Sequence, residues 1–275
     1  MDGNKPFFLK EGIFVEYVKA KKKYGQNFLK NKEILENIAN SISVQENDLI
    51  VEIGPGMGAL TEYLYKKDCY LLCYEIDPRM KNYLENYNTK RSQVVFDDFL
   101  NRNVFEDVKR FSYHSLYVVA NIPYYITSPI ISKLIELEEK PKEIVLLVQK
   151  EVAERITADA STRDYNAFTL FISYLYEAKL LFYVDRNQFV PSPNVDSAVI
   201  QLIRKEKIEV QDKDFFLRFV RDAFQNKRKT LKNNLKEYDW KKIKHILEDL
   251  GYSENVRAEE IKKCDFYCLV NQYEV

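Results

Sequence analysis

The first 200 residues alternate short apolar runs with amphipathic stretches, and this alternation limits the possible folds more than any other feature. Runs rich in β-branched and aromatic residues predict strands, and apolar residues spaced three or four apart predict helices. Strands that are apolar on both faces belong to a parallel sheet with helices on each side. The sequence therefore predicts an α/β fold with a doubly wound sheet. The expected strands are residues 49–53, 70–76, 93–96, 116–120 and 144–148, and the expected helices are residues 33–42, 59–67, 78–87 and 128–138.

The pattern changes twice in the last third of the chain. Two further strand-like runs, residues 180–184 and 198–204, flank a proline-containing loop at residues 189–195, which predicts an antiparallel, hairpin-like edge. Beyond Lys205 the remaining periodicity is helical, at residues 212–224, 230–235, 241–250 and 258–270. We therefore expect an N-terminal extension (1–20), an α/β domain (21–205) and a small all-helical C-terminal domain (206–275).

Positive charge is concentrated in two segments, although the chain as a whole is neutral, with 42 Lys and Arg against 42 Asp and Glu. Residues 17–32 hold six Lys and no acidic residue, and residues 218–244 hold ten Lys or Arg against three acidic residues. Local basic faces bind phosphate, so both segments are candidate RNA contacts; the alternative for each is a solvated helix face. The candidate RNA-binding residues are Lys21, Lys22, Lys23, Arg221, Lys227, Arg228, Lys229 and Lys232.

Neither a membrane nor a metal is expected as a partner. No apolar run approaches the ~18 residues that span a bilayer. The first 20 residues contain Asp2, Glu11 and Glu16 and have no apolar signal core. The four Cys lack the CxxC spacing of a zinc site, so we expect buried, reduced thiols. These features predict a cytoplasmic protein.

The first predicted strand runs into a glycine-rich turn, Gly54-Pro55-Gly56-Met57-Gly58. Glycine lets the backbone approach a ligand closely, and the following helix offers free N–H groups. The spacing is GxGxG rather than the GxGxxG of a pyrophosphate-binding turn, and Pro55 removes a backbone donor that a phosphate would use. The turn therefore favours a cofactor without phosphates, of which S-adenosylmethionine is the common one; a simple tight turn is the alternative.

Acidic residues follow the second and third predicted strands. Glu75 is placed to accept hydrogen bonds from both ribose hydroxyls of a nucleoside cofactor, a feature that nicotinamide sites share. Asp98 can accept a hydrogen bond from the exocyclic amine of adenine, and Phe99 or Ile76 can cover the face of the ring. The alternatives are a surface acid at Glu75 and a helix N-cap at Asp98.

The motif Asn121-Ile122-Pro123-Tyr124 follows the fourth predicted strand and is the most specific short motif in the chain. An aromatic amine is a poor nucleophile because its lone pair is delocalised into the ring. The Asn121 oxygen and a nearby backbone carbonyl can each accept one N–H, which makes the nitrogen more nucleophilic, while Tyr124 stacks on the base. Such a base must be flipped out of its stack or already unpaired. The alternative is an ordinary Asn-x-Pro turn.

Phe189 lies in the proline-containing loop and is a candidate second stacking surface for the base. The alternative for this residue is a core aromatic that precedes a loop. With it, the candidate catalytic residues are Asn121, Tyr124 and Phe189.

These motifs occur in an order that resembles the ribosomal RNA adenine dimethyltransferase family over nearly the whole chain, from Tyr24 to about residue 270. The resemblance implies a Rossmann-like domain that depends on S-adenosylmethionine. Three of the runs, QKEVA, VDSAV and KRKTL, look like the small-subunit branch in particular. The motifs that carry the resemblance are Gly25-Gln26-Asn27-Phe28-Leu29, Glu52-Ile53-Gly54-Pro55-Gly56, Asp98-Phe99-Leu100, Asn121-Ile122-Pro123-Tyr124, Gln149-Lys150-Glu151-Val152-Ala153, Val195-Asp196-Ser197-Ala198-Val199 and Asn226-Lys227-Arg228-Lys229-Thr230-Leu231.

The resemblance also implies roles for motif residues. Gln26, Asn27 and Leu29 look like the segment that folds over the methionine end of the cofactor, and Gly54 and its neighbours look like the floor of its site. Asn121 resembles the residue that holds both the cofactor and the target amine. The candidate cofactor-binding residues are Gln26, Asn27, Leu29, Glu52, Gly54, Gly56, Glu75, Ile76, Asp98, Phe99 and Asn121.

The implied reaction is the transfer of two methyl groups to N6 of each of two adjacent adenosines in the 3′-terminal helix of small-subunit rRNA. Attack of N6 is in line with the sulfonium methyl, and the implied substrate is an immature, 30S-type subunit on which the protein acts as a monomer. Three alternatives stay open: a large-subunit rRNA methyltransferase of the macrolide-resistance type, a ribosome assembly factor without catalysis, and a nicotinamide oxidoreductase.

Overall fold

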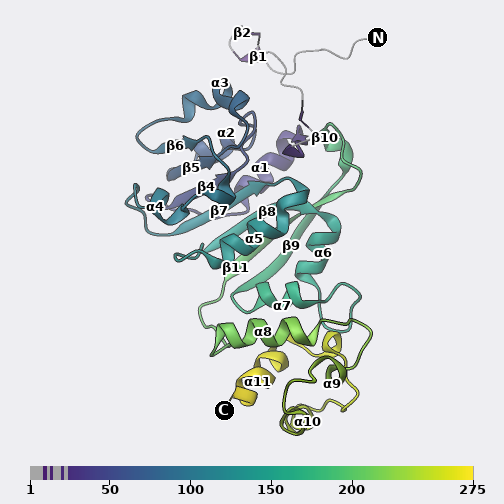
Figure 1. Cartoon of the computed structure of the whole chain (residues 1–275). Coiled ribbons are helices and arrows are strands. Elements are labelled where there is room, and N and C mark those ends of the chain that lie inside the picture. Colours follow the sequence, from purple (N-terminus) through teal and green to yellow (C-terminus); the bar gives the residue numbers. More distant parts are fainter. Residues whose placement is uncertain (1–8, 11–12, 15–19, 22–23, 275) are drawn as a thin grey trace.

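The protein, described by a computed structural model over residues 9–10, 13–14, 20–21 and 24–274, is built around a seven-stranded sheet (Figure 1). In chain order the strands are β4 (Leu49–Ile53), β5 (Tyr70–Tyr74), β6 (Ser92–Val95), β7 (Leu116–Asn121), β8 (Glu143–Gln149), β9 (Tyr176–Val184) and β11 (Ser197–Arg204). Across the sheet their order is β6-β5-β4-β7-β8-β11-β9. The first five strands of this order run parallel, and β11 is antiparallel to both of its neighbours.

The predicted doubly wound α/β fold is confirmed, and so is the antiparallel edge formed by β9 and β11. All five residues of β4 are buried, as expected for a strand with helices on both faces. Strand β9 begins at Tyr176, four residues before the predicted start. It is one of the two edge strands, and the exposed Glu177 and Lys179 near its start interrupt the apolar run that the prediction relied on.

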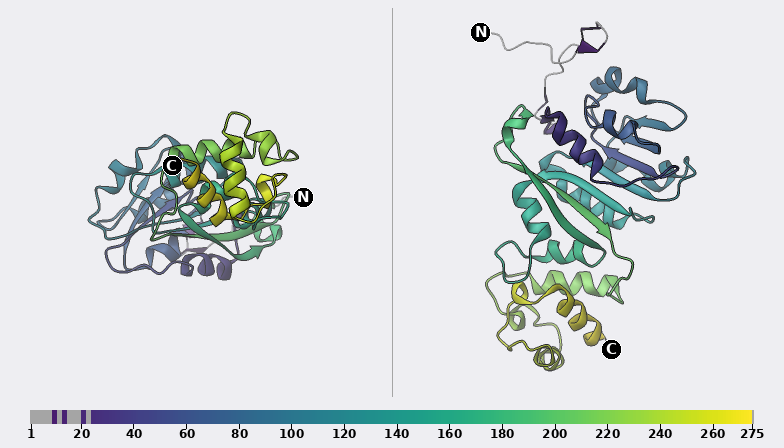
Figure 2. Two further views of the ribbon diagram at one scale, coloured as in Figure 1. Left: turned by 90° about the horizontal axis from the view of Figure 1, so that it is seen from below. Right: turned by 180° about the vertical axis from the view of Figure 1, so that it is seen from behind.

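Helices cover both faces of the sheet (Figures 1 and 2). On one face lie α1 (Lys32–Asn40), α2 (Thr61–Tyr65) and α3 (Lys81–Leu84), whose apolar side chains share a cluster with Ile50 of β4. The other face carries α5 (Thr127–Glu136), which was predicted, and α4 (Val104–Val108), α6 (Lys150–Thr157) and α7 (Ala167–Ser173). The helix predicted at residues 78–87 is broken, because 3₁₀ turns at Pro78–Met80 and Glu85–Tyr87 flank α3.

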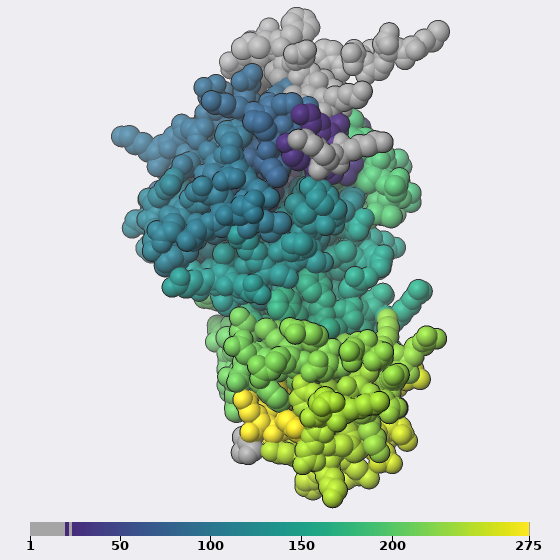
Figure 3. Space-filling model, in the orientation of Figure 1, coloured from purple at the N-terminus to yellow at the C-terminus, as the bar shows by residue number. Residues whose placement is uncertain are grey.

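The C-terminal part of the described chain is helical, as predicted, and forms the lower lobe in Figure 3. Its aromatic side chains continue the apolar cluster of the sheet. The hydroxyl oxygen of Tyr267 lies 2.6 Å from that of Ser173 on α7. The division into domains near residues 205–211 stays a prediction; β11 ends at Arg204 and the next helix begins at Lys213. The helices are α8 (Lys213–Ala223), α9 (Leu231–Asn234), α10 (Trp240–Asp249) and α11 (Lys263–Glu274), with a 3₁₀ turn at Ala258–Glu260 before α11.

Two further strand pairs lie outside the central sheet. The short strands β3 (Phe28–Leu29) and β10 (Phe189–Val190) pair antiparallel, which fastens the segment before α1 to the loop between β9 and β11. The strands β1 (Leu9–Lys10) and β2 (Ile13–Phe14) also pair with each other. The pairing of β3 with β10 was not predicted, and it places residues 24–29 beside the carboxyl ends of the central strands.

Two further predictions concern the membrane and the thiols. Among the residues described, none of the helices has the length and apolar character needed to cross a membrane. Cys69 and Cys73 are buried, as predicted. The same prediction is wrong for Cys264, which is exposed, and for Cys268, which is half-buried, because both lie on the outer side of α11.

Candidate cofactor and catalytic site

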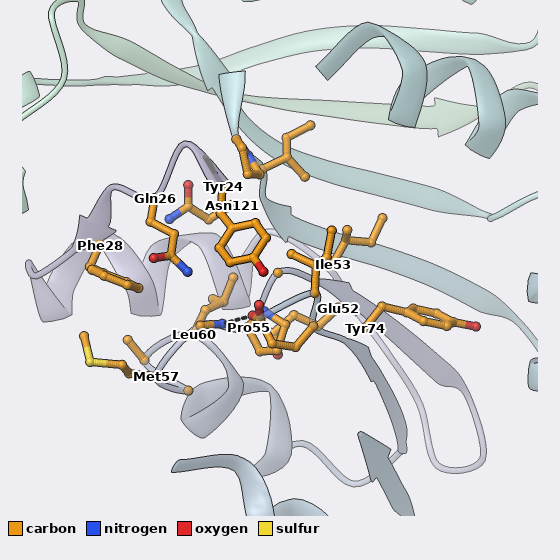
Figure 4. A pocket seen from close by; sticks show the side chains of 18 of the residues that line it. Tyr24, Gln26, Phe28, Glu52, Ile53, Pro55, Met57, Leu60, Tyr74 and Asn121 are labelled. Carbon is orange, nitrogen blue, oxygen red and sulfur yellow. Dashed lines mark hydrogen bonds between the residues drawn. The ribbon is translucent and has the colours of Figure 1, made fainter. Parts of the chain in front are cut away.

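A cavity of about 710 Å³ opens at the carboxyl ends of β4, β5 and β7. The strand order reverses between β4 and β7, and doubly wound sheets bind ligands at such a point. Three segments form the walls: the glycine turn after β4, the segment of residues 24–29 and the Asn121–Tyr124 motif after β7. Figure 4 shows Tyr24, Gln26 and Phe28 around the same cavity as Glu52 and Asn121.

The glycine turn follows β4 in a backbone conformation that favours glycine. Gly54 has a φ of +74° and Gly56 a φ of +57°. A Cβ at Gly56 would lie 3.2 Å from the ring of Phe28, so the turn and the N-terminal segment are packed directly against each other. A Cβ at Gly54 would face the backbone oxygen of Asn121 at 3.7 Å. The turn therefore brings bare backbone to the cavity between the other two walls.

Glu75 follows β5 and points into the same cavity. Its side chain is buried and accepts hydrogen bonds from the backbone N–H of Gly56 at 2.8 Å and of Asp77 at 2.7 Å. Burial raises the pKa of the carboxyl, and the two backbone hydrogen bonds limit the rise. Glu75 is therefore not the free surface acid of the alternative interpretation; it is a fixed acceptor on the cavity wall.

Glu52 lies on β4 under the glycine turn and is 1% exposed. Burial raises the pKa of its carboxyl to about 7, and the negative charge of Glu75 acts in the same direction. The thiol of Cys73 donates a hydrogen bond to Glu52 across 3.5 Å. Near neutral pH this carboxyl therefore changes its charge directly beneath the site.

Asp98 and Phe99 lie on the cavity wall after β6. Asp98 accepts a hydrogen bond from the backbone N–H of Leu100 at 2.9 Å, so it caps a 3₁₀ turn, as the alternative interpretation proposed, and it also lines the cavity. Phe99 is buried against Tyr74, with ring centroids 5.3 Å apart. Ile76 is 43% exposed at the cavity, which makes it the more accessible of the two residues predicted to cover an adenine ring.

Asn121 ends β7 at the cavity, and the chain then turns through Pro123. Within the described part of the chain, the Asn121 side chain has no hydrogen-bonding partner, so its oxygen and its N–H groups are available to a ligand. Tyr124 lines the cavity too, and its hydroxyl lies 2.6 Å from that of Ser197 at the start of β11. Burial raises the pKa of the Tyr124 phenol, and the hydrogen bond with Ser197 opposes the rise.

Phe189 does not lie where the sequence suggested. It is 2% exposed, belongs to the apolar cluster of the α1 face and is not part of the cavity wall. Its strand β10 is only two residues long and pairs Phe189 with the buried Leu29, so the next residue, Val190, faces the cavity instead. In this conformation Phe189 is the core aromatic of the alternative interpretation.

The N-terminal segment brings its three predicted residues to the cavity. Leu29 is buried in strand β3, and Asn27 donates a hydrogen bond to the backbone oxygen of Gly25 at 3.3 Å. The Gln26 amide is engaged by protein groups: it donates to Asp77 at 3.0 Å and accepts from the backbone N–H of Lys21 at 2.9 Å. The sequence did not single out Asp77, whose only signal was its place two residues after Glu75.

The predicted RNA-binding residues that the structure describes lie in two places: Lys21 lies beside the cavity segment, where its backbone N–H donates to Gln26, and the others lie in the C-terminal helical part. Lys21 is exposed, whereas Lys22 and Lys23 lie outside the described residues. Lys227 donates a hydrogen bond to the backbone oxygen of Arg163 at 2.6 Å, in a polar groove of about 810 Å³ that Arg155 also lines. The sequence did not predict this groove. The remaining predicted residues are exposed on the C-terminal helices and the loops between them; they are Arg221, Arg228, Lys229 and Lys232.

The parallel sheet, the glycine turn and the two acidic residues after β5 and β6 define a Rossmann-like methyltransferase. A family model described as ribosomal RNA adenine dimethylase matches residues 17–274. The chain belongs to that family.

Individual relatives agree with this assignment. The chain is 39% identical to a ribosomal RNA small subunit methyltransferase A of Streptococcus thermophilus over 258 residues, which cover 90% of this chain and 89% of the relative. A crystal structure of a dimethyladenosine transferase from Plasmodium falciparum superposes with a TM-score of 0.75 at 28% identity, covering 90% of this chain and 97% of that one. A 23S rRNA methyltransferase superposes with a TM-score of 0.72 at 24% identity, with 90% and 100% covered, and shares the fold.

Proposed function

We propose that this protein dimethylates N6 of two adjacent adenosines in the 3′-terminal helix of small-subunit rRNA, with S-adenosylmethionine as methyl donor. The Asn121 amide at the cavity, which has no hydrogen-bonding partner among the described residues, carries the proposal, because a site that activates an aromatic amine needs a side-chain acceptor at that place. Membership of the family and 39% identity to a small-subunit enzyme support the choice of the small subunit.

The residues of the cavity fit S-adenosylmethionine. Glu75 offers a buried carboxylate to ribose hydroxyls and Asp98 an acceptor to adenine, while the bare backbone at Gly54 admits a ligand closely. The acidic side chains on the wall also suit a cationic ligand. When bound, the cofactor supplies a methyl group on a positively charged sulfur.

The chain's own groups act by positioning. Asn121 accepts one N–H of the target amine, which draws its lone pair out of the ring, and Tyr124 stacks on the base. No buried anion forms when a cationic donor loses its methyl group, so orientation of the two reactants supplies most of the acceleration. The sulfur leaves as a neutral thioether, and the methylated nitrogen loses its proton to water at the open side of the cavity.

The proposed substrate is an immature 30S-type subunit, which the protein meets as a monomer in the cytoplasm. A folded rRNA surface presents phosphates on several sides, and the exposed cations of the C-terminal helices suit such a surface. The groove at Lys227 lies between these helices and α6, and its wall carries three basic and three acidic side chains, so the proposed phosphate contacts are the exposed cations rather than the groove itself.

Methyl transfer from labelled S-adenosylmethionine to undermethylated small subunits tests the proposal, with large subunits in parallel and modified positions mapped. Label on two adjacent adenines of the small-subunit 3′-terminal helix is the expected result. Label on large-subunit RNA overturns the choice of subunit, and tight subunit binding without label favours the assembly factor. Binding titrations with NAD and with S-adenosylmethionine test the nicotinamide oxidoreductase alternative. We expect S-adenosylmethionine to bind and NAD not to bind, which would exclude that alternative.

A further inference from the structure

Three side chains from two distant parts of the chain meet at the rim of the cavity. The Gln26 amide nitrogen donates to Asp77 Oδ2 at 3.0 Å. The Arg79 guanidinium donates from Nε to both oxygens of Asp77, at 3.0 and 3.1 Å, and from Nη2 to Gln26 Oε1 at 3.4 Å. We call this set of Gln26, Asp77 and Arg79 the clamp.

The clamp is built around a carboxylate that solvent does not reach. The Asp77 side chain is 0% exposed, and Arg79 is 30% exposed. Burial opposes ionisation of Asp77, but the hydrogen bonds from Arg79 and Gln26 outweigh burial and lower its pKa to about 2. A buried, charged acceptor with fork-shaped donation holds its partners in one geometry.

The same residue is tied to the cofactor wall through its backbone. The Asp77 N–H donates to Glu75 Oε1 at 2.7 Å, and the other oxygen of Glu75 accepts from Gly56 N–H at 2.8 Å. The glycine turn, the predicted ribose acid and the clamp therefore form one continuous hydrogen-bonded unit. A movement of Gln26 away from Asp77 breaks this unit at its outer end.

We propose that Asp77 and Arg79 are positioning residues for the cofactor: through Gln26 they hold residues 24–29 over the cavity. The pairing of β3 with β10 fastens this segment at Phe28 and Leu29, and the clamp fastens it nearer its other end. Neither Asp77 nor Arg79 lines the cavity, so both act through Gln26 and Glu75. This inference rests on the proposed use of the cavity for S-adenosylmethionine.

A second ion pair in the same domain provides a matched control. Arg102 and Asp107 have side chains 31% and 2% exposed, close to the 30% and 0% of Arg79 and Asp77. Arg102 also donates from Nε and Nη2 to its carboxylate partner, and neither residue lines the cavity. Replacing either arginine by lysine keeps the charge and removes the fork.

The test measures the dissociation constant of S-adenosylmethionine, and hydrogen exchange of backbone amides 25–29, in full-length Arg79→Lys, Asp77→Asn and Arg102→Lys. Arg79→Lys and Asp77→Asn should weaken binding roughly tenfold and speed exchange in this segment, because each removes a charge-assisted hydrogen bond of the clamp. Arg102→Lys should change neither readout. Unchanged binding in Arg79→Lys overturns the proposal, and so does an equal loss in Arg102→Lys, which would indicate general destabilisation.

A double-mutant cycle with Gln26→Ala provides a second readout. If Arg79 acts through Gln26, the loss in Gln26→Ala/Arg79→Lys should be smaller than the product of the two single losses. Independent, multiplicative losses contradict the proposal. Failure of the unmodified protein to bind S-adenosylmethionine overturns the proposed function and this inference with it, whereas unmodified binding with silent clamp variants overturns the clamp alone.

Discussion

The phenol oxygen of Tyr124 lies 2.6 Å from the hydroxyl oxygen of Ser197. Tyr124 belongs to the motif at the end of β7, and Ser197 begins β11. The contact therefore joins two sequence motifs at the carboxyl ends of the parallel strands. Ser197 is fully buried, which makes the contact a fixed support for the ring rather than a surface interaction. The contact between the two motifs therefore fixes the orientation of the Tyr124 ring.

Because the hydroxyl of Tyr124 contacts Ser197, the role of the hydroxyl can be tested separately from the role of the ring. Tyr124→Phe keeps the stacking surface and loses one hydrogen bond of about 1 kcal/mol, so kcat/KM for methyl transfer should fall only severalfold. Tyr124→Ala removes a stacking surface that contributes about 1–3 kcal/mol per base, so the fall should be roughly 5- to 150-fold and larger than in Tyr124→Phe. Ser197→Ala should resemble Tyr124→Phe. Equal losses in Tyr124→Phe and Tyr124→Ala would contradict a stacking role.

The glycine turn predicts a difference between two Gly→Ala substitutions. At Gly56, alanine adds the strain of a positive φ, about 1–2 kcal/mol, and a Cβ 3.2 Å from the Phe28 ring. At Gly251 the φ is also positive, at +82°, but no heavy atom of the described residues lies within 4 Å of an added Cβ. Gly56→Ala should lower the melting temperature and weaken S-adenosylmethionine binding, while Gly251→Ala should lower the melting temperature alone. The two readouts are thermal unfolding and calorimetric titration; weakened binding in both variants would contradict the close packing of turn and segment.

Glu52 makes stability depend on pH. Its pKa is raised by burial to about 7, so between about pH 4.5 and 7 the folded state binds more protons than the unfolded state. Unfolding free energy therefore falls as pH rises through this window, by on the order of 3 kcal/mol from this group. Glu75, whose pKa is also raised by burial, contributes in the same direction.

Glu52→Gln has no proton to lose, so denaturant unfolding should show a flatter pH dependence than in the unmodified protein. Glu106→Gln is the control, because the Glu106 side chain is 60% exposed and paired with Lys109. It should leave the pH dependence unchanged. A curve for Glu52→Gln that parallels the unmodified protein between pH 5 and 7 would contradict the assignment.

The exposed cations Lys227 and Lys229 predict the salt dependence of subunit binding. Replacing both with Gln should weaken binding and reduce the slope of log K against log salt by about one for each phosphate that is no longer neutralised. Lys109→Gln is the control for loss of a single exposed charge, since Lys109 directly follows α4 and lies far in sequence from both basic segments. Filter binding to small subunits at several salt concentrations measures both quantities. A slope that is unchanged in the double variant would exclude these residues from the RNA interface.

The central strands were predictable because they are buried on both faces. Ile50 and Val51 pack in different apolar clusters on opposite sides of the sheet, and such strands appear in sequence as uninterrupted apolar runs. The edge strand β9 was only partly predictable, because exposed polar residues interrupt its start.

Some residues of the candidate site were predictable from the sequence and others were not. Gly54 and Glu75 each follow a strand, and Asn121 ends one, at the same edge of the sheet, so strand order alone brings them together. The placement of Phe189 was not predictable, since it depends on the pairing of two-residue strands that carry no periodic signal. Asp77 and Arg79 were not recognised for a different reason. Their partner Gln26 is about 50 residues away in the sequence, and no local sequence pattern predicts such an interaction.

The proposed mechanism depends above all on Asn121, which activates an adenine amine of small-subunit rRNA at this cavity. This role can be tested directly by mass spectrometry, which detects the methyl groups on small-subunit rRNA after reaction with the unmodified protein or with Asn121→Ala. The unmodified protein should place two methyl groups on each of two adjacent adenosines. Asn121→Ala should bind the subunit normally, remain folded by circular dichroism and transfer methyl groups at least about 100-fold more slowly, the loss expected for a positioned polar group. Near-normal transfer by folded Asn121→Ala would contradict this role of Asn121.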